Sequence, residues 1–410
     1  MNKSAHHSSW RWIPSLYFAE GLPYAIIISV SVVMYKNLEV SNSAIALYTS
    51  WFYLPWVIKP LWSPLVDLTR SKRWWIIAMQ TLLGIGFGVV AFFIPTSFFL
   101  QTTIAMLWLM AFCSATHDIA ADGFYMLAQN ADQQKFFVGV RNIFYRIAMV
   151  VAQGVIVMSA GILCRLTNSM TIAWSLIFVG IAVLMLLLAV YHYFQLPKAK
   201  SDAQPTDRTT ADIFISFFQK KNIIVAIAFI LLYRLGEAQL SKMAAPFMLD
   251  ATMAGGLSLS NEEVGLIYGT IGVIALLIGG LVGGVVAARD GLKKWLWPMI
   301  LAMNVPNIVY VVMATVQPTN FVTICSAVAI EQLGYGFGFT AFTLFLIHFS
   351  DGKYKTAHYA LCTGLMALGM MLPGMISGWV EEQLGYQMFF VYVLICCVPG
   401  MILARWIEVE

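Results

Sequence analysis

The residues with the clearest capacity for chemistry are two acids and two bases on either side of one turn, in the stretch 113–146. Asp118 and Asp122 lie in the apolar segment before the turn, and Arg141 and Arg146 lie in the apolar segment after it. In an antiparallel hairpin, Asp118 lies level with Arg146, and Asp122 lies level with Arg141. Ionisable groups at membrane depth are costly to bury and by default functional. The pattern predicts a static ion-pair clamp, a part in gating or proton movement, or both.

Other apolar segments carry polar groups at helical spacing. Their members are three, four or seven positions apart, so each set shares one face of a helix. The sets are Tyr17, Glu20 and Tyr24; Asp118 and Asp122; Arg234, Glu237 and Ser241; and Glu331 with Tyr335. An aspartyl enzyme dyad of Asp118 and Asp122 is disfavoured, because two nearby arginines fit charge pairing better than a shared proton.

The composition predicts a membrane protein with many spans. Of 410 residues, 60% are hydrophobic and 11% are charged, whereas about a quarter are charged in ordinary soluble domains. The net charge of +4 comes without a basic patch interleaved with aromatics, so no nucleic-acid partner is expected. The sequence has no phosphate-binding loop or hydrolase motif, and its six cysteines lack metal-ligand spacing. We therefore expect neither an enzyme nor a metal or cofactor.

The elements that position these residues are apolar runs of about 20 residues, the length of a membrane-spanning helix. The predicted spans are 13–34, 43–66, 74–95, 102–128, 138–162, 171–194, 222–248, 263–288, 295–315, 320–349, 356–380 and 385–406. The longest polar stretch separates six spans from six. The predicted organisation is a six-helix bundle over 1–194, a linker over 195–221 and a six-helix bundle over 222–410.

The basic residues predict the orientation of these spans. If the N-terminus is cytoplasmic, the loops on that side hold most lysines and arginines, and the opposite side has only Lys36 and Arg165. Cytoplasmic loops are rich in Lys and Arg, so both termini and the linker are predicted to be cytoplasmic. Five further cations fall inside or at the ends of spans and need partners; they are Lys59, Arg141, Arg146, Arg234 and Lys242.

The two halves of the chain resemble each other. SLYFAEGLPY carries Tyr17 and Glu20, and LLYRLGEAQL carries Tyr233 and Glu237 about half the chain later. The loops PLVDLTRSKRWW and GGVVAARDGLKKWLW also match, each running from small or apolar residues through an acid and basic residues to Trp. Transporters built from repeats commonly bind substrate near the middle of the membrane, where the repeats meet.

Six plus six helices with this repeated charged loop resemble the major facilitator superfamily. More specific segments resemble the AmpG-type muropeptide permeases and related acetyl-CoA transporters; they are GLPYA, KPLWSPLVD, SATHDIAADGFY, YRLGEA and NEEVGLIYGTIG. The chain departs from the AmpG pattern at His117, where that pattern has Gln. The resemblance implies proton-coupled import across the bacterial inner membrane. The implied cargo is N-acetylglucosaminyl-anhydro-muramic acid, with or without its peptide, and a monomer is expected.

In such a fold, helices 1, 4, 7 and 10 line a central cavity, and the polar sets lie on these four helices. Glu20 and Asp118 are the leading predicted proton carriers, since burial favours the protonated carboxyl and a cationic partner favours the charged one. Asp122, Glu237 and Glu331 are further candidates. Glu237 lies one turn from Arg234, so a permanently paired structural acid is an equal alternative for it.

The predicted substrate-binding residues offer aromatic faces, hydrogen bonds or a cation for a carboxylate. They are Tyr17, Tyr24, Trp56, Lys59, His117, Tyr125, Tyr233, Arg234, Tyr268 and Tyr335. For these residues the alternatives are an interfacial aromatic, a snorkelling lysine at Lys59 and a satisfied hydrogen-bonding group at His117. The predicted gating or ion-pair residues are Asp67, Arg70, Arg73, Arg141, Arg146 and Arg289.

Other functions stay open at this point. Within transport, the cargo is alternatively another amino sugar, a small peptide or an acetyl-CoA-like molecule. A receptor that binds a fragment without moving it is a different class, favoured by a large domain outside the membrane, and no such domain is evident.

Overall fold

The computed structural model describes residues 9–129, 131–197 and 210–407, and every regular element in these ranges is a helix. Ten helices in the described ranges are long and apolar enough to cross a membrane. One of them, α19 (Lys355–Leu403), contains Gly385 with a φ of 70°, so it joins two of the predicted spans across a kink. The predicted span 43–66 is split into α4 (Asn42–Trp51) and α5 (Leu54–Thr69). The all-α, multi-span fold predicted from the sequence is confirmed.

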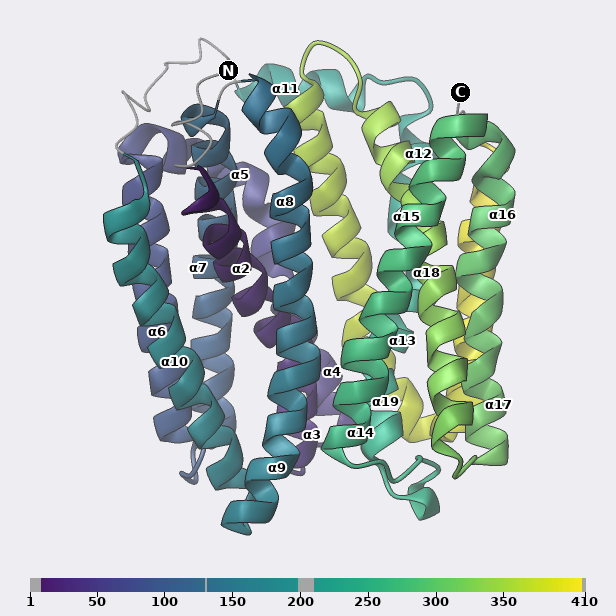
Figure 1. The fold of residues 1–410 in the computed structure, drawn as a ribbon. Helices are drawn as coiled ribbons and strands as arrows, with labels where there is room; N and C mark the ends of the chain where they lie inside the picture. Colours follow the sequence, from purple (N-terminus) through teal and green to yellow (C-terminus); the bar gives the residue numbers. More distant parts are fainter. Residues whose placement is uncertain (1–8, 130, 198–209, 408–410) are drawn as a thin grey trace. The chain divides into compact units, whose positions relative to one another are not determined.

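The contacts divide the chain into two compact units, and each is taken here by itself. The first comprises Met1–Met34 and Leu61–Thr206. Its main helices, purple to teal in Figure 1, are α2 (Ile13–Ala25), α6 (Lys72–Phe93), α7 (Phe99–Ala128), α8 (Ala131–Val150), α9 (Val157–Thr167) and α10 (Met170–Gln195). Helix α6 packs against both α7 and α10, and α2 packs against α8 and α7. Short π-helical turns, Ile26–Val30 and Val151–Ile156, interrupt the long spans.

The second unit comprises Tyr35–Pro60 and Asp207–Glu410. Its helices include α4 (Asn42–Trp51), α12 (Ile223–Leu232), α13 (Leu235–Leu249), α15 (Val273–Asp290), α16 (Leu292–Asn304), α17 (Ile308–Val316), α18 (Phe321–Phe349) and α19, with short α11 (Thr210–Phe218) and α14 (Asn261–Val264) and the π-helix η4 (Gly265–Gly272). Helix α4 packs against α19, and α15 packs against α18 (Figure 1). The division of the chain into bundles at 1–194 and 222–410 remains a prediction.

Two of the boundaries between the units fall inside helices. The first boundary follows Met34, within α3 (Ser31–Asn37), and the second follows Pro60, within α5 (Leu54–Thr69). Between α4 and α5 the helix is interrupted at Phe52 and Tyr53. Proline lacks an amide hydrogen and is tolerated in the first turn of a helix, and Pro55 lies in the first turn of α5, directly after this interruption. Helix α4 is therefore a separate short helix, divided from α5 by this interruption.

Glycines allow α15 and α18 to approach closely. A Cβ atom on Gly279 would lie 2.0 Å from the Leu333 carbonyl oxygen, and one on Gly336 would lie 1.9 Å from that of Leu276. Small residues at such crossings permit backbone contact in membranes, where lipid gives apolar side chains little reason to associate.

We expect Gly279→Ala to lower stability by about 1–3 kcal/mol, the usual cost of forcing extra atoms into a packed interior. The midpoint of thermal unfolding in detergent, followed by tryptophan fluorescence, measures this loss. Gly284→Ala is the matched control on the same helix, because its Cβ would meet nothing within 4 Å. Equal midpoints for the two variants would contradict the packing argument.

Candidate functional site

In the first unit, α2, α7 and α8 bring together an acid, a base and two tyrosines. Arg141 Nη1 lies 3.0 Å from Asp122 Oδ1 and donates a hydrogen bond of 3.2 Å to the Tyr17 hydroxyl. This hydroxyl donates to Asp122 Oδ1 at 3.2 Å. The Arg141 guanidinium also lies 4.8 Å from the ring centre of Tyr17 and 5.3 Å from that of Tyr125. The predicted pairing of Asp122 with Arg141 is confirmed.

Glu20 lies one turn beyond this group on α2 and is buried. Its Oε2 atom has no hydrogen-bond partner among the described residues. The charges of Asp118, Asp122 and Arg141 act on it. Helix α2 approaches α8 closely because Gly21 has no side chain. A Cβ at that position would lie 2.8 Å from a carbonyl oxygen of α8. We call Tyr17, Glu20, Asp118, Asp122, Tyr125 and Arg141 the first polar cluster.

Two other predictions for this unit have different outcomes. Arg146 is half-buried and forms no ion pair among the described residues, so its predicted pairing with Asp118 is not observed there. Asp118 lies near Glu20 of α2, on which its charge acts. Tyr24 is half-buried, and its ring lies 6.5 Å from that of Tyr145.

His117 belongs to a buried chain of hydrogen bonds. Its Nε2 atom lies 2.9 Å from the amide nitrogen of Gln80, whose amide oxygen lies 2.9 Å from His192 Nδ1. The other ring nitrogen of His192 lies 2.9 Å from the Ser15 hydroxyl. Gln80 and His192 are 0% exposed and His117 is 1% exposed. Nε2 of His117 thus has the kind of partner that buried polar groups need, whereas its Nδ1 atom has no hydrogen-bond partner among the described residues.

The second unit holds a comparable group on α13, η4 and α18. Glu237 and Glu331 are 5% and 0% exposed, and the charge of Glu237 acts on Glu331. Gln332 donates a hydrogen bond of 2.9 Å to Oε2 of Glu331. In the described part of the chain, Oε1 of Glu331 and Oε2 of Glu237 have no hydrogen-bond partner. The charges of Glu237 and Glu331 both act on Tyr268 of η4.

Arg234 lies at the break between α12 and α13. It donates a short hydrogen bond to the Tyr335 hydroxyl, and its guanidinium lies 5.5 Å from the Tyr335 ring centre and 5.0 Å from that of Phe339. Tyr233 is buried, donates to the Gly338 carbonyl at 3.0 Å and stacks on an α18 phenylalanine. Tyr233 therefore fixes α12 against α18. We call Arg234, Glu237, Tyr268, Glu331 and Tyr335 the second polar cluster.

The remaining predicted residues lie outside both clusters. Trp56 and Lys59 are half-buried on α5, within the second unit. Arg70 stacks over Trp74, and Arg289 pairs with neighbouring Asp290 at 3.0 Å.

Two more predicted residues concern the charged loop of the first unit. Arg73 contacts the Tyr193 carbonyl and lies over the Tyr193 ring. Asp67 is a residue of α5 whose side chain is outside the described part of the structure. A cavity of about 210 Å³ beside Lys220 and Trp406 has none of the predicted substrate-binding residues in its lining.

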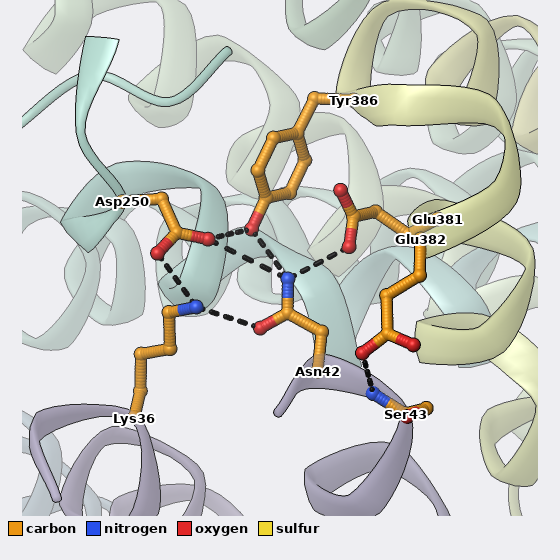
Figure 2. A network of polar contacts seen from close by, with 7 residues as sticks. All are labelled: Lys36, Asn42, Ser43, Asp250, Glu381, Glu382 and Tyr386. Carbon is orange, nitrogen blue, oxygen red and sulfur yellow. Dashed lines mark hydrogen bonds and ion pairs between the residues drawn. The ribbon is translucent and has the colours of Figure 1, made fainter. Parts of the chain in front are cut away.

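The sequence analysis missed a polar network that holds α4 against α13 and α19 (Figure 2). Lys36 Nζ lies 2.6 Å from Asp250 Oδ1 and donates to the Asn42 amide oxygen at 2.9 Å. The Asn42 amide nitrogen donates to Glu381 Oε2 at 2.7 Å and contacts the Tyr386 hydroxyl at 2.9 Å. That hydroxyl donates to Asp250 Oδ2 at 2.5 Å. We call these five residues the α4 network.

One sequence signal pointed to this network. Lys36 is one of only two basic residues in the loops that are predicted to lie on the side of the membrane opposite the termini. A cation kept there against the general bias needs an acidic partner, and Asp250 lies just beyond a predicted span. The partners on α19 had no such signal, because they are more than 300 residues away from Asn42.

Comparison with known proteins completes the description of the site. The sequence profile described as Major Facilitator Superfamily matches residues 15–236, more than half of the chain. The anhydromuropeptide permease of Escherichia coli K12 is 26% identical over 401 residues, which cover 95% of this chain and 77% of the permease. A putative transporter, AmpG 4, of Rickettsia conorii is 25% identical over 416 residues, covering 96% of this chain and 95% of the relative.

Solved structures show the same fold at lower identity. The crystal structure of a D-xylose-proton symporter superposes with a TM-score of 0.74 at 11% identity, and the match covers 98% of each chain. This likeness concerns the arrangement of the helices alone.

Proposed function

The chain belongs to the Major Facilitator Superfamily and is a secondary transporter, and on this premise we propose that it imports peptidoglycan turnover fragments together with protons. The proposed cargo is N-acetylglucosaminyl-anhydro-muramic acid, with or without its peptide. The proposal is supported by the relatives named as anhydromuropeptide permease and AmpG transporters, which match nearly the whole chain.

The observation that carries the proposal is that each unit holds a buried carboxyl, Glu20 in the first and Glu237 and Glu331 in the second, beside tyrosines and an arginine. A buried carboxyl binds or releases a proton when its partners and its hydration change. Tyrosine faces and hydroxyls suit a sugar, and a guanidinium suits a carboxylate. We assign the proton to Glu20 with Asp118 in the first polar cluster, and to Glu237 and Glu331 in the second. The pairing of Asp122 with Arg141 is the proposed gating contact.

The proposed location is the bacterial inner membrane, with the protein acting as a monomer and with both termini in the cytoplasm. The distribution of lysines and arginines among the loops supports this orientation. The lipid bilayer is then the solvent for the apolar helix faces, many of whose large side chains are exposed.

The proposed function is tested by uptake into proteoliposomes. The purified protein is expected to accumulate radiolabelled N-acetylglucosaminyl-anhydro-muramic acid against its gradient when the interior is alkaline, and only to equilibrate it without a pH gradient. One proton moving down one pH unit releases about 1.4 kcal/mol, which supports an about tenfold concentration ratio.

N-acetylglucosamine, a tripeptide and acetyl-CoA serve as competing cargoes in the same vesicles. Preferred uptake of one of them would replace the proposed cargo. Binding of the muropeptide without any movement into the vesicle would instead favour a receptor.

A further inference from the structure

Lys242 is a buried lysine whose side chain contacts only neutral groups among the described residues. It lies on α13 and is 2% exposed. Its Nζ atom donates to the Thr49 hydroxyl at 2.9 Å and lies 5.3 Å from the ring centre of Tyr53. Among the described residues it forms no ion pair. An ammonium group removed from water without an anion is strongly disfavoured, so an anion bound beside Lys242 would stabilise the charged form of its side chain.

A second polar group beside Lys242 is also unsatisfied. The Ser50 hydroxyl is 0% exposed and has no hydrogen-bond partner among the described residues. Gly374 of α19 leaves room for both side chains: a Cβ there would lie 2.7 Å from Ser50 Oγ and 3.5 Å from Lys242 Cγ. The Thr49 hydroxyl donates to the Ile45 carbonyl at 2.8 Å, so the groups left to donate to a ligand are the Lys242 side chain of α13 and the Ser50 hydroxyl of α4. These are donors suited to the two oxygens of a carboxylate.

Access to this place depends on α4. Thr49 and Ser50 are near the end of α4, directly before the helix interruption at Phe52. Near its other end, α4 is held to α13 and α19 by the α4 network, as Figure 2 shows. The acids of that network, Asp250 and Glu381, are engaged with Lys36 and Asn42, about two helical turns from Thr49 along α4.

We propose that Lys242, with the hydroxyl of Ser50, binds the carboxylate of the cargo when α4 moves away from α13 and α19. The inference rests on the proposed function, since the muramic acid part of that cargo carries a carboxylate. With α4 docked, the ammonium is covered and meets only neutral groups. The cargo supplies the missing anion, so the transporter selects acids over their neutral analogues.

The test compares two probes that differ only in this group: N-acetylglucosaminyl-anhydro-muramic acid and its carboxamide. Binding to the full chain in lipid nanodiscs is measured by scintillation proximity. The unchanged protein is expected to bind the acid at least about tenfold more tightly, because a charge-assisted hydrogen bond is replaced by a neutral one. Lys242→Met is expected to bind both probes equally, whereas Lys242→Arg is expected to keep the preference.

Lys294→Met is the matched control, since Lys294 is an exposed lysine of the same unit, 67% accessible to solvent. It is expected to keep the preference for the acid. Thermal unfolding separates a purely structural role: a Lys242→Met protein that is less stable but still prefers the acid overturns the inference. If Lys242→Met does not fold, Ser50→Ala decides, with Lys242→Arg as its control. Ser50→Ala is expected to lose part of the preference for the acid, and an undiminished preference in Ser50→Ala overturns the inference.

The two proposals fail in different ways. If the unchanged protein binds neither probe, the proposed cargo is wrong, and the carboxylate site falls with it. If it binds both probes equally, the cargo stands and only the role of Lys242 is overturned.

Discussion

Replacing Glu20 with glutamine is expected to abolish concentrative uptake, so that the inside-to-outside ratio of cargo falls from about tenfold per pH unit to about one. The amide keeps the shape of the carboxyl but cannot exchange a proton. Glu20 is buried, with one oxygen lacking a hydrogen-bond partner in the described part of the chain, and it lies beside Asp118 and Asp122. Exchange of labelled for unlabelled cargo is expected to survive, because exchange needs no net proton movement.

The measurement uses proteoliposomes with an imposed pH gradient, together with an exchange assay in vesicles of equal pH. Glu39→Gln is the control, since Glu39 is an exposed acid on the loop before α4. It is expected to accumulate cargo normally. Undiminished accumulation by Glu20→Gln would remove Glu20 as the proton carrier and leave Asp118 or the second polar cluster in that role.

Replacing Asn42 with leucine is expected to release α4 from the second unit. Asn42 connects Lys36, Asp250, Glu381 and Tyr386, so leucine leaves several of these groups buried without their hydrogen bonds. Each such loss costs about 1–3 kcal/mol, which changes the ratio of docked to released α4 by roughly ten- to a hundredfold. Amide hydrogen exchange over Asn42–Trp51 is expected to accelerate correspondingly.

Leu47→Ala is the control for that experiment, because Leu47 is on the same helix and is 38% exposed. Its exchange pattern is expected to match that of the unchanged protein. A slow, unaltered exchange of α4 in Asn42→Leu would show that close packing holds the helix by itself. In that case the close backbone contact at Gly378 of α19 would hold α4 in place. A Cβ on Gly378 would lie 2.0 Å from the Asn42 carbonyl oxygen.

The pairing of Asp122 with Arg141 illustrates what local reasoning predicts well. Both residues lie close to one turn, so the antiparallel register of two helices fixes their levels, and the ion pair forms at 3.0 Å. The same argument placed Asp118 level with Arg146, and an ion pair between these two residues is not observed in the described part of the chain. A third helix, α2, brings Glu20 to the neighbourhood of Asp118, and register arguments contain no information about such a neighbour.

By itself, the sequence determined the membrane class, the multi-span helical fold and the polar helix faces, because composition and helical periodicity are properties of short segments. The tertiary structure alone decided which faces meet. It placed His117 in a buried chain with Gln80 and His192, and it left Lys242 against a hydroxyl and a ring. It also joined Asn42 to Glu381, since the partners of a buried polar group are chosen by packing between segments that lie far apart in the chain.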